Sequence, residues 1–402
     1  MNGAGHLRGL KVVDVSDAAL AYGGRMLAEL GADVVLIEPP EGGRARRVPP
    51  LASVASGETV SIHFAFAAAG KRSMTLDASS AEGGELFRRL VSAADVVLAA
   101  PADGEPSVLG ASFAELQELN PRLVVTALTP FGLRGPNRRW RGSDLVGWAA
   151  GGVLPSVGDR DRAPLAPGGG LADMTGATNA VMGTMLALRT RRRTGRGQIV
   201  DISRQEAVIS VALEAGPHII METAAPQTRT GKRRRTVPIG HYRTKDGAVT
   251  IVAYMPWQWQ ALAEWIQEET GNESVTLEVF AGTPVARLPY ADAVDLWIEE
   301  LTTRYGKQEF FEEAQRRGIP ASPVNSIADL YEDPHLAATE AWQTVEQPGL
   351  GALRYPRPPI RFDGESGTVG LVPTLGEHTE AVLAELGASS GEIAALRSAG
   401  VV

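Results

Sequence analysis

The first 130 residues predict a doubly wound α/β domain, because short apolar runs alternate there with stretches of helical spacing. The apolar runs are typical of parallel strands that are buried on both faces. We place these strands at residues 11–15, 33–38, 73–76, 95–99 and 123–128. Amphipathic helices are expected between them, at residues 22–30, 81–93 and 113–119. Ligands bind such Rossmann-like sheets beyond the carboxyl ends of the strands.

The rest of the chain predicts more helices and a second, smaller unit. Helices are expected at residues 144–152, 173–190, 205–221, 257–270, 291–305, 308–317 and 378–386. A strand should follow the tight TGRGQ turn that begins at Thr194. Residues 224–238 have the composition of a linker. Asp246-Gly247 then predicts a hairpin turn at the start of a small α+β domain.

Composition excludes several classes of function. The chain has 402 residues and a formal net charge of -8, which argues against a general nucleic-acid binder. It has no cysteine, so disulfides, thiol catalysis and iron–sulfur ligation are excluded. The six histidines lack metal-binding spacing, and we expect no metal. Since we find neither a signal peptide nor a long apolar run, we expect a cytoplasmic protein without membrane contact.

One carboxylate, Asp173, lies between a glycine run and a long helix of small residues. A desolvated carboxylate held against a carbonyl carbon can act as a nucleophile. Asp is also favoured as the N-cap of a helix, and the spacing alone leaves both roles open. The glycines at 168, 169 and 170 (Gly168, Gly169, Gly170) either offer N–H groups to an oxyanion or form a flexible turn.

Segments along nearly the whole chain resemble the family III CoA-transferases. They are LRGLKVVDVSDAALAYGGRMLAELGADVVLIEPPEG, GKRSMTLD, ELNPRLVVTALTPFG, GLADMTGATNAVMG, TGRGQIVDIS, residues 242–247, GIPASPV and LGEHTEAVLAELG. That family includes formyl-CoA transferase and carnitine CoA-transferase, with 2-methylacyl-CoA racemase as a relative. The resemblance implies a large α/β domain built from both chain ends (residues 1–224 and 326–402), a small domain at 225–325, and an interlocked homodimer.

The resemblance also implies a reaction. Asp173 aligns with the family's nucleophilic aspartate, which attacks an acyl-CoA thioester to give a mixed anhydride and then an aspartyl-CoA thioester. A carboxylic acid then accepts the CoA. The CoA thioester is therefore a substrate, and no permanently bound cofactor is expected.

The CoA contacts are likewise implied by the resemblance. Asp17, Ala18 and Ala19 should lie beside the pantetheine and thioester. Lys71 and Arg72 should meet phosphates, although a solvated strand start would explain them equally well. Leu76, Ala78 and Ala100 should flank the adenine, and Arg141 should contact a phosphate or the adenine. Trp148 belongs to the region expected to shape the acceptor pocket.

The sequence departs from the family pattern at several positions. Val108 stands where an arginine is expected near the diphosphate, and Ala68-Ala69-Gly70 replaces an Asn-x-Asn element. The cluster at 232–235 could supply replacement charge. Ser143 precedes Asp144 where the racemases have histidine, so racemisation is disfavoured.

Three alternatives stay open at this point. The chain could bind an acyl-CoA without transferring it, or it could need a partner subunit. Glu38 at the end of the second strand is a weak sign of an NAD(P)-dependent oxidoreductase, since no GxGxxG motif precedes it.

Overall fold

The computed structural model describes residues 5–16, 18–53, 59–101, 104–159, 161–212 and 236–402. The chain forms two compact units. Unit 1 comprises residues 1–154, 166–225 and 338–402, and unit 2 comprises residues 155–165 and 226–337. Unit 1 therefore draws on both chain ends, and the domain limits of 225 and 325 stay a prediction.

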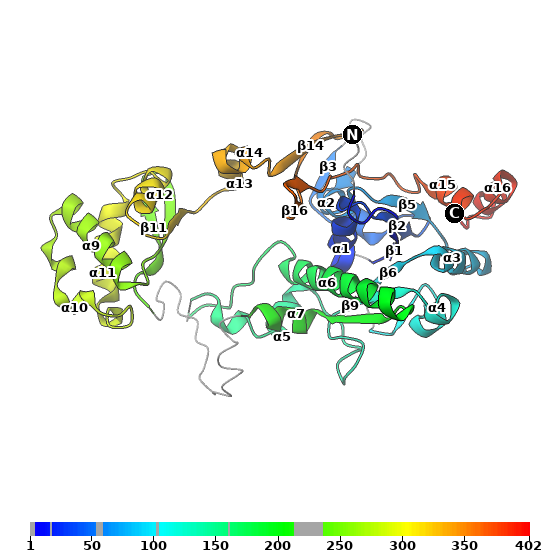
Figure 1. The fold of residues 1–402 in the computed structure, drawn as a ribbon, viewed down its shortest axis with the longest axis horizontal. Coiled ribbons are helices and arrows are strands. Elements are labelled where there is room, and N and C mark those ends of the chain that lie inside the picture. The colour runs from blue at the N-terminus through cyan, green and yellow to red at the C-terminus, as the bar shows by residue number, and fades with distance from the viewer. Residues whose placement is uncertain (1–4, 17, 54–58, 102–103, 160, 213–235) are drawn as a thin grey trace. The chain divides into compact units, whose positions relative to one another are not determined.

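A six-stranded parallel sheet forms the centre of unit 1, in the order β10-β9-β6-β1-β2-β5 (Figure 1). The strands are β1 (Lys11–Val15), β2 (Asp33–Glu38), β5 (Arg72–Thr75), β6 (Val96–Ala99), β9 (Val124–Thr129) and β10 (Ile199–Ser203). The predicted α/β fold with a parallel sheet is confirmed. The chain runs outward from β1 toward β5 on one side and from β6 toward β10 on the other. The switch point for ligand binding therefore lies between β1 and β6.

Alternate strand residues pack against two different sets of helices, because successive strand side chains point to opposite faces. Val13 and Val97 pack on the side of α3 (Ala81–Ala93), α4 (Phe113–Leu119), α15 (Thr379–Glu385) and α16 (Ser390–Ser398). These four helices lie together at one side of the sheet in Figure 1. Val12 and Val96 pack on the other side, against α1 (Ala18–Glu29) and α6 (Leu171–Thr194).

The long helix α6 lies close to the sheet because its inward positions are small. A Cβ at Gly176 would lie 2.8 Å from Leu128 Cδ1, and one at Gly183 would lie 2.7 Å from Val200 Cγ1. Larger residues at these positions would push the helix away from β9 and β10. The close approach sets the position of the first turn of α6, where Asp173 lies.

The sequence pattern locates most of the large elements and misses several smaller ones. The helix expected at 144–152 is α5 (Asp144–Ala150), and α7 (Arg204–Val211) covers the start of the helix expected at 205–221. Residues 213–221, most of the linker at 224–238 and the basic cluster at 232–235 lie outside the described residues. The missed elements are α2 (Ile62–Ala68), α16, and the hairpin of β14 (Trp342–Gln347) and β15 (Gly351–Pro356).

The sequence carries a signal for the start of α16, a capping box. The Ser389 hydroxyl accepts a hydrogen bond from the Glu392 amide, and the Glu392 carboxylate accepts one from the Ser389 amide. The other elements of unit 1 are short. They are η1 (Arg44–Arg47), β3 (Leu51–Ser53), β4 (Thr59–Ser61), β7 (Ser107–Val108), β8 (Ala111–Ser112), β16 (Arg361–Phe362) and β17 (Glu365–Ser366). The short η2 (Leu154–Ser156) begins at the last residue of the first segment of unit 1 and continues into unit 2.

Unit 2 contains a three-stranded antiparallel sheet of β11 (Ile239–Thr244), β12 (Gly247–Val252) and β13 (Ala321–Pro323). Its larger helices are α9 (Pro256–Thr270), α11 (Ala291–Thr302) and α12 (Lys307–Arg316). Smaller elements are η3 (Glu273–Thr276), α10 (Glu278–Ala281), η4 (Leu288–Tyr290) and α13 (Ile327–Glu332), and α14 (Pro334–Ala338) follows. Trp259 and Trp265 are buried in its core, whereas Trp257 is exposed.

Candidate active site

A cavity of about 590 Å³ opens at the carboxyl ends of β1 and β2. Val15 and Ser16 come from the end of β1, and Glu38 and Pro39 from the end of β2. Further lining side chains come from α1, η1, α2 and the start of α6, namely Ala19, Tyr22, Arg44, His63, Phe64, Phe66, Asp173 and Met174. All of them belong to unit 1, and most of the wall is apolar. The cavity lies beyond the carboxyl ends of the strands, where open α/β sheets bind ligands, on the β2 side of the switch point, and it has the size of a ligand site.

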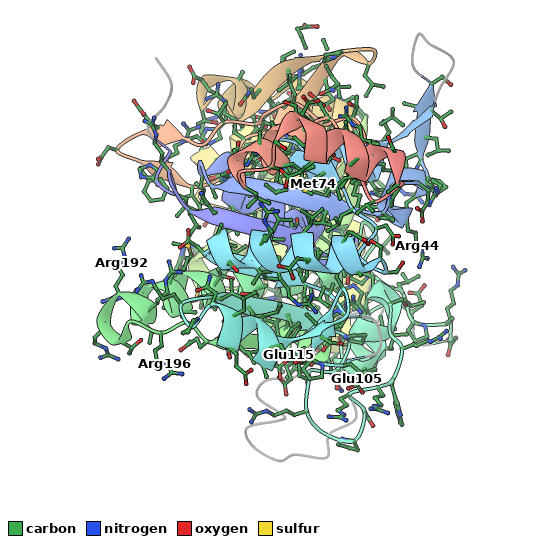
Figure 2. The ribbon with its side chains drawn as sticks, turned by 90° about the vertical axis from the view of Figure 1, so that its right-hand side faces the viewer. Arg44, Met74, Glu105, Glu115, Arg192 and Arg196 are labelled. Carbon is green, nitrogen blue, oxygen red and sulfur yellow. The ribbon has the colours of Figure 1, made fainter. Side chains whose placement is uncertain are left out.

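A second cavity of about 570 Å³ lies at the opposite ends of the strands. It is lined by Arg8, Asp95 and the basic C-terminal turns of α6, including Arg189 and Arg192. Figure 2 shows Arg192 on the opposite side of the view from Arg44. Because this cavity lies at the amino ends of the strands, we take the first cavity as the candidate active site.

The amino end of α6 is capped by a side chain from α5. Gly170 is the N-cap residue, with φ 71°, and makes no side-chain cap. The Asp144 Oδ1 atom instead accepts hydrogen bonds from the amides of Ala172 (2.7 Å) and Asp173 (3.1 Å). Asp173 is the third helical residue, so its alternative role as the N-cap is wrong. Its role as a nucleophile stays a prediction.

The Asp173 carboxylate forms an ion pair with Arg204, the first residue of α7. Arg204 Nε lies 2.5 Å from Asp173 Oδ1, and the Arg204 side chain is only 5% exposed. Oδ1 itself is buried, yet the Asp173 side chain as a whole is 26% exposed. The open part of the side chain is therefore Oδ2 and the stem, on the wall of the cavity. Asp173 holds one oxygen against a cation and leaves the other accessible.

Arg204 reaches Asp173 because glycines in α5 leave room for it. A Cβ at Gly147 would lie 2.6 Å from Arg204 Cδ, and one at Gly151 would lie 2.3 Å from Val208 Cγ1. α5 and α7 thus pack through a glycine face. Sequence reasoning missed Arg204, although a cation directly after the carboxyl end of a parallel strand was a usable signal.

Burial raises the pKa of Asp173 above its ordinary value of 3.8. The Arg204 guanidinium acts in the opposite direction and favours the carboxylate, while the neighbouring Asp144 carboxylate raises the pKa further. A partly desolvated carboxylate is more nucleophilic than a hydrated one. The surroundings of Asp173 therefore keep its carboxylate ionised through Arg204 and, by partial burial, reactive toward a thioester carbonyl.

A buried ion pair fixes the turn between β1 and α1. Lys71 Nζ lies 2.8 Å from Asp14 Oδ2, and the two side chains are 1% and 0% exposed. Lys71 also donates to the Ala21 carbonyl, and the amide and hydroxyl of Ser16 donate to Asp14 Oδ1. A Cβ at Gly24 would lie 2.2 Å from Asp14 Oδ2, so only glycine leaves space for the pair. Lys71 lines the cavity, and its contact with a phosphate stays a prediction.

Both carboxylate oxygens of Glu38 accept hydrogen bonds from other protein side chains. Arg46 donates to both of its oxygens at 2.7 Å, and the Ser73 hydroxyl donates to Oε2 at 2.7 Å. The Arg46 guanidinium also lies 4.1 Å from the centroid of the Phe64 ring. Glu38 therefore shapes the cavity wall and has no oxygen left over for a ribose.

The structure brings some of the expected contact residues to this cavity and not others. Ala19, Lys71, Gly169 and Gly170 line it. Arg72 is tied to Asp33 and Glu385, away from the cavity. Leu76 is buried in the core, and Ala78 packs against the same core.

The remaining expected contacts lie off the cavity wall or outside the described residues. Ala100 packs on the core cluster that contains α1 and α6, and Gly168 and Arg141 are exposed. Trp148 is buried against Ala172 and Val208. Asp17 lies outside the described residues, and Ala18 is the first residue of α1.

Residues 7–379 match CoA-transferase family III. The chain belongs to this family. It is 33% identical to the BbsE subunit of succinyl-CoA:(R)-benzylsuccinate CoA-transferase from Thauera aromatica, over 98% of this chain and 97% of that protein. It is 30% identical to formyl-CoA:oxalate CoA-transferase from Streptomyces coelicolor, over 98% of this chain and 99% of that protein.

The fold is also similar to that of solved structures. A CAIB/BAIF family protein from Brucella suis superposes with a TM-score of 0.83 at 31% identity, over 95% of this chain and 99% of that one. The chain is therefore a CoA-transferase, and CoA thioesters are its substrates. Among the described residues, no helix is both long and apolar enough to span a bilayer, and no cluster of His, Asp and Glu could hold a metal ion.

Proposed function

We propose that this CoA-transferase moves CoA from an acyl-CoA to a carboxylic acid through covalent intermediates on Asp173. The observation that carries the proposal is the asymmetry of the Asp173 carboxylate, with Oδ1 held by Arg204 and the rest of the group on the cavity wall. A nucleophile needs one free oxygen and a fixed orientation, and this arrangement supplies both.

Four steps complete the proposed reaction. Asp173 Oδ2 attacks the thioester carbonyl carbon, the C–S bond breaks, and CoA leaves as thiolate. The thiolate attacks Cγ of the mixed anhydride and expels the donor carboxylate, which leaves an aspartyl-CoA thioester. The acceptor carboxylate attacks Cγ of that thioester and releases the thiolate. The thiolate then attacks the acceptor acyl carbon, so that acceptor-CoA forms and the Asp173 carboxylate returns.

The shape and lining of the cavity support binding of the pantetheine arm. The walls formed by Val15, Phe64 and Met174 are apolar, and the volume of about 590 Å³ suits a slender chain. Gly169 and Gly170 lie beside Asp173, where their backbone can approach the thioester closely.

Arg44 is our candidate for a phosphate contact at this cavity. It is exposed on the cavity wall, and the described residues give its guanidinium no carboxylate partner. We expect Arg44→Glu to raise KM for acyl-CoA by roughly tenfold or more with little change in kcat, because it replaces an attraction to phosphate with a repulsion. Steady-state kinetics against acyl-CoA test this, with Arg47→Glu in the same turn as the control. An unchanged KM would remove Arg44 from the site.

Intact-protein mass spectrometry tests the covalent route. The protein is mixed with each of a panel of acyl-CoAs, including succinyl-CoA and formyl-CoA, and quenched in acid. We expect adducts with the added mass of the acyl group or of CoA, both lost from the Asp173→Ala variant. Turnover by the wild-type protein with no adduct at any quench time would reject the covalent route.

The pH dependence of the first step should report on Asp173. Only the carboxylate attacks, so the acylation rate falls as pH drops through the raised pKa of Asp173. The midpoint should lie above the ordinary value of 3.8, and Asp144→Asn should lower it because one neighbouring negative charge is removed. Pre-steady-state release of CoA measures the rate. A midpoint that does not respond to Asp144 would contradict this assignment.

A second candidate is that the chain acts only with a partner subunit. It is favoured by several relatives that are themselves named as subunits. The exposed side chains of Met182, Met185 and Leu186 on α6 would suit either a second copy of this chain, as in the interlocked homodimer, or a different partner. Light scattering combined with an activity assay of the pure protein separates the two: an active dimer supports the homodimer, and an inactive monomer supports a partner subunit.

A further inference from the structure

We propose that Arg204 is a catalytic residue that stabilises the oxyanion formed on Asp173 when thiolate attacks the aspartyl carbon. The inference rests on the proposed function and assigns a role within it. Arg204 does not line the cavity, so it acts on the enzyme's own carbonyl group and not on the incoming substrate.

The contact geometry determines which oxygen is acylated. Asp173 Oδ1 is buried and lies 2.5 Å from Arg204 Nε, so an incoming thioester can reach only Oδ2. After acylation, Oδ2 is the bridging atom of the anhydride and Oδ1 is the carbonyl oxygen of the aspartyl group. The guanidinium then faces the one atom that must accept negative charge in the next step.

Oδ1 loses its negative charge on acylation and regains it when thiolate attacks Cγ, so Arg204 favours this attack. Acylation removes the carboxylate charge and leaves a buried guanidinium beside a neutral carbonyl. Attack of CoA thiolate on Cγ places a full negative charge on Oδ1, and collapse of this intermediate breaks the Cγ–Oδ2 bond and expels the donor carboxylate. Arg204 therefore binds the transition state more strongly than the anhydride, which is the condition for catalysis.

The ion pair between Arg204 and Asp173 opposes the first step, the attack of Asp173 on the thioester, to a smaller degree. While Asp173 is a free carboxylate, Arg204 stabilises it and lowers its nucleophilicity. At a pH well above the pKa of Asp173, where the carboxylate stays ionised without Arg204, removing Arg204 should therefore slow thioester formation but not acylation. A merely structural role would slow both steps together.

The packing around Arg204 supports a fixed and specialised position. The Nε and Nη1 atoms are buried and donate to no other protein group among the described residues, so the guanidinium is available to Asp173 Oδ1, which lies 2.5 Å from Nε. Gly147 leaves room for the side chain, since a Cβ there would lie 2.6 Å from Arg204 Cδ. Removing one group that stabilises the oxyanion costs roughly 10²–10³-fold in rate in other acyl-transfer enzymes.

The test measures the two half-reactions separately in the full-length protein. Wild type, Arg204→Leu and Arg204→Lys are mixed rapidly with acyl-CoA, quenched in acid and weighed intact. We expect Arg204→Leu to release CoA and accumulate the acyl adduct, while the CoA adduct and net turnover fall roughly 10²–10³-fold. Arg204→Lys should recover part of the second step, because it restores a cation with shorter reach.

Val208→Ala is the matched control. Val208 lies one turn further along α7 and packs on Gly151 in the same α5–α7 contact, but it carries no charge. We expect it to lower the melting temperature and leave the ratio of the two half-reaction rates unchanged.

Two outcomes would overturn the role of Arg204. One is an Arg204→Leu variant that forms the CoA adduct at the wild-type rate. The other is an Arg204→Leu variant in which both steps slow by the same factor, as they would from a structural defect. A wild-type protein that forms no adduct at all is a different result, because it rejects the proposed function itself.

Discussion

Asp173→Ala is expected to lower CoA transfer by on the order of 10⁴-fold or more, because it removes the group through which every covalent step passes. Acyl-CoA should still bind, since the apolar wall and Arg44 are unchanged. The measurement is a transfer assay with the donor and acceptor that the adduct screen identifies, together with calorimetric titration of acyl-CoA. Binding without turnover is the expected result, and full turnover by this variant would reject the nucleophile.

A control for folding is needed because Asp173 is the counterion of a buried arginine. Asp173→Ala leaves the Arg204 guanidinium buried without a negative partner, which destabilises the unit. The double variant Asp173→Ala/Arg204→Leu removes both charges and should recover much of the lost stability, yet stay inactive. Stable and inactive double-variant protein separates loss of the nucleophile from loss of the fold.

The sequence predicted the strands of the sheet well because a strand is determined by the pattern of apolar residues within its own few positions. Residues 96–99 and 124–129 are buried on both faces and are apolar except for Thr126 and Thr129, as is typical of buried parallel strands. The role of Asp173 could not be decided in the same way. Its helix is capped by Asp144, which lies 29 residues earlier in the chain, and the hydrogen bonds exist only once α5 packs against α6. The contact of Arg204 with Asp173 also depends on packing, although the position of Arg204 directly after β10 was a usable signal.

The CoA contacts show a different kind of limit. Lys71 and Arg72 were predicted together as phosphate ligands, but successive residues in an extended chain point to opposite faces. Lys71 points toward α1 and joins Asp14, while Arg72 joins Asp33 and Glu385. The period of two was visible in the sequence and could have separated the two residues. The identity of their partners depends on the order of the strands, which the pattern does not supply.

Lys71→Met is expected to lower the free energy of unfolding of unit 1 by about 3–5 kcal/mol, because it leaves the Asp14 carboxylate buried without a cation. Both side chains are fully buried, so solvent screens neither. The change should also loosen the turn that carries Ser16 and raise KM for acyl-CoA. Hydrogen exchange in peptides that cover β1 and β6 measures the stability of this unit separately from unit 2.

Arg72→Met, at the next residue, is the matched control for that prediction. Its ion pairs with Asp33 and Glu385 are partly open to water, and such pairs contribute about 1 kcal/mol or less. Adding Asp14→Asn to Lys71→Met removes both buried charges and keeps an oxygen for the Ser16 amide, so it should recover part of the lost stability. If Lys71→Met and Arg72→Met cost the same, the buried pair is not what fixes the turn beside the cavity.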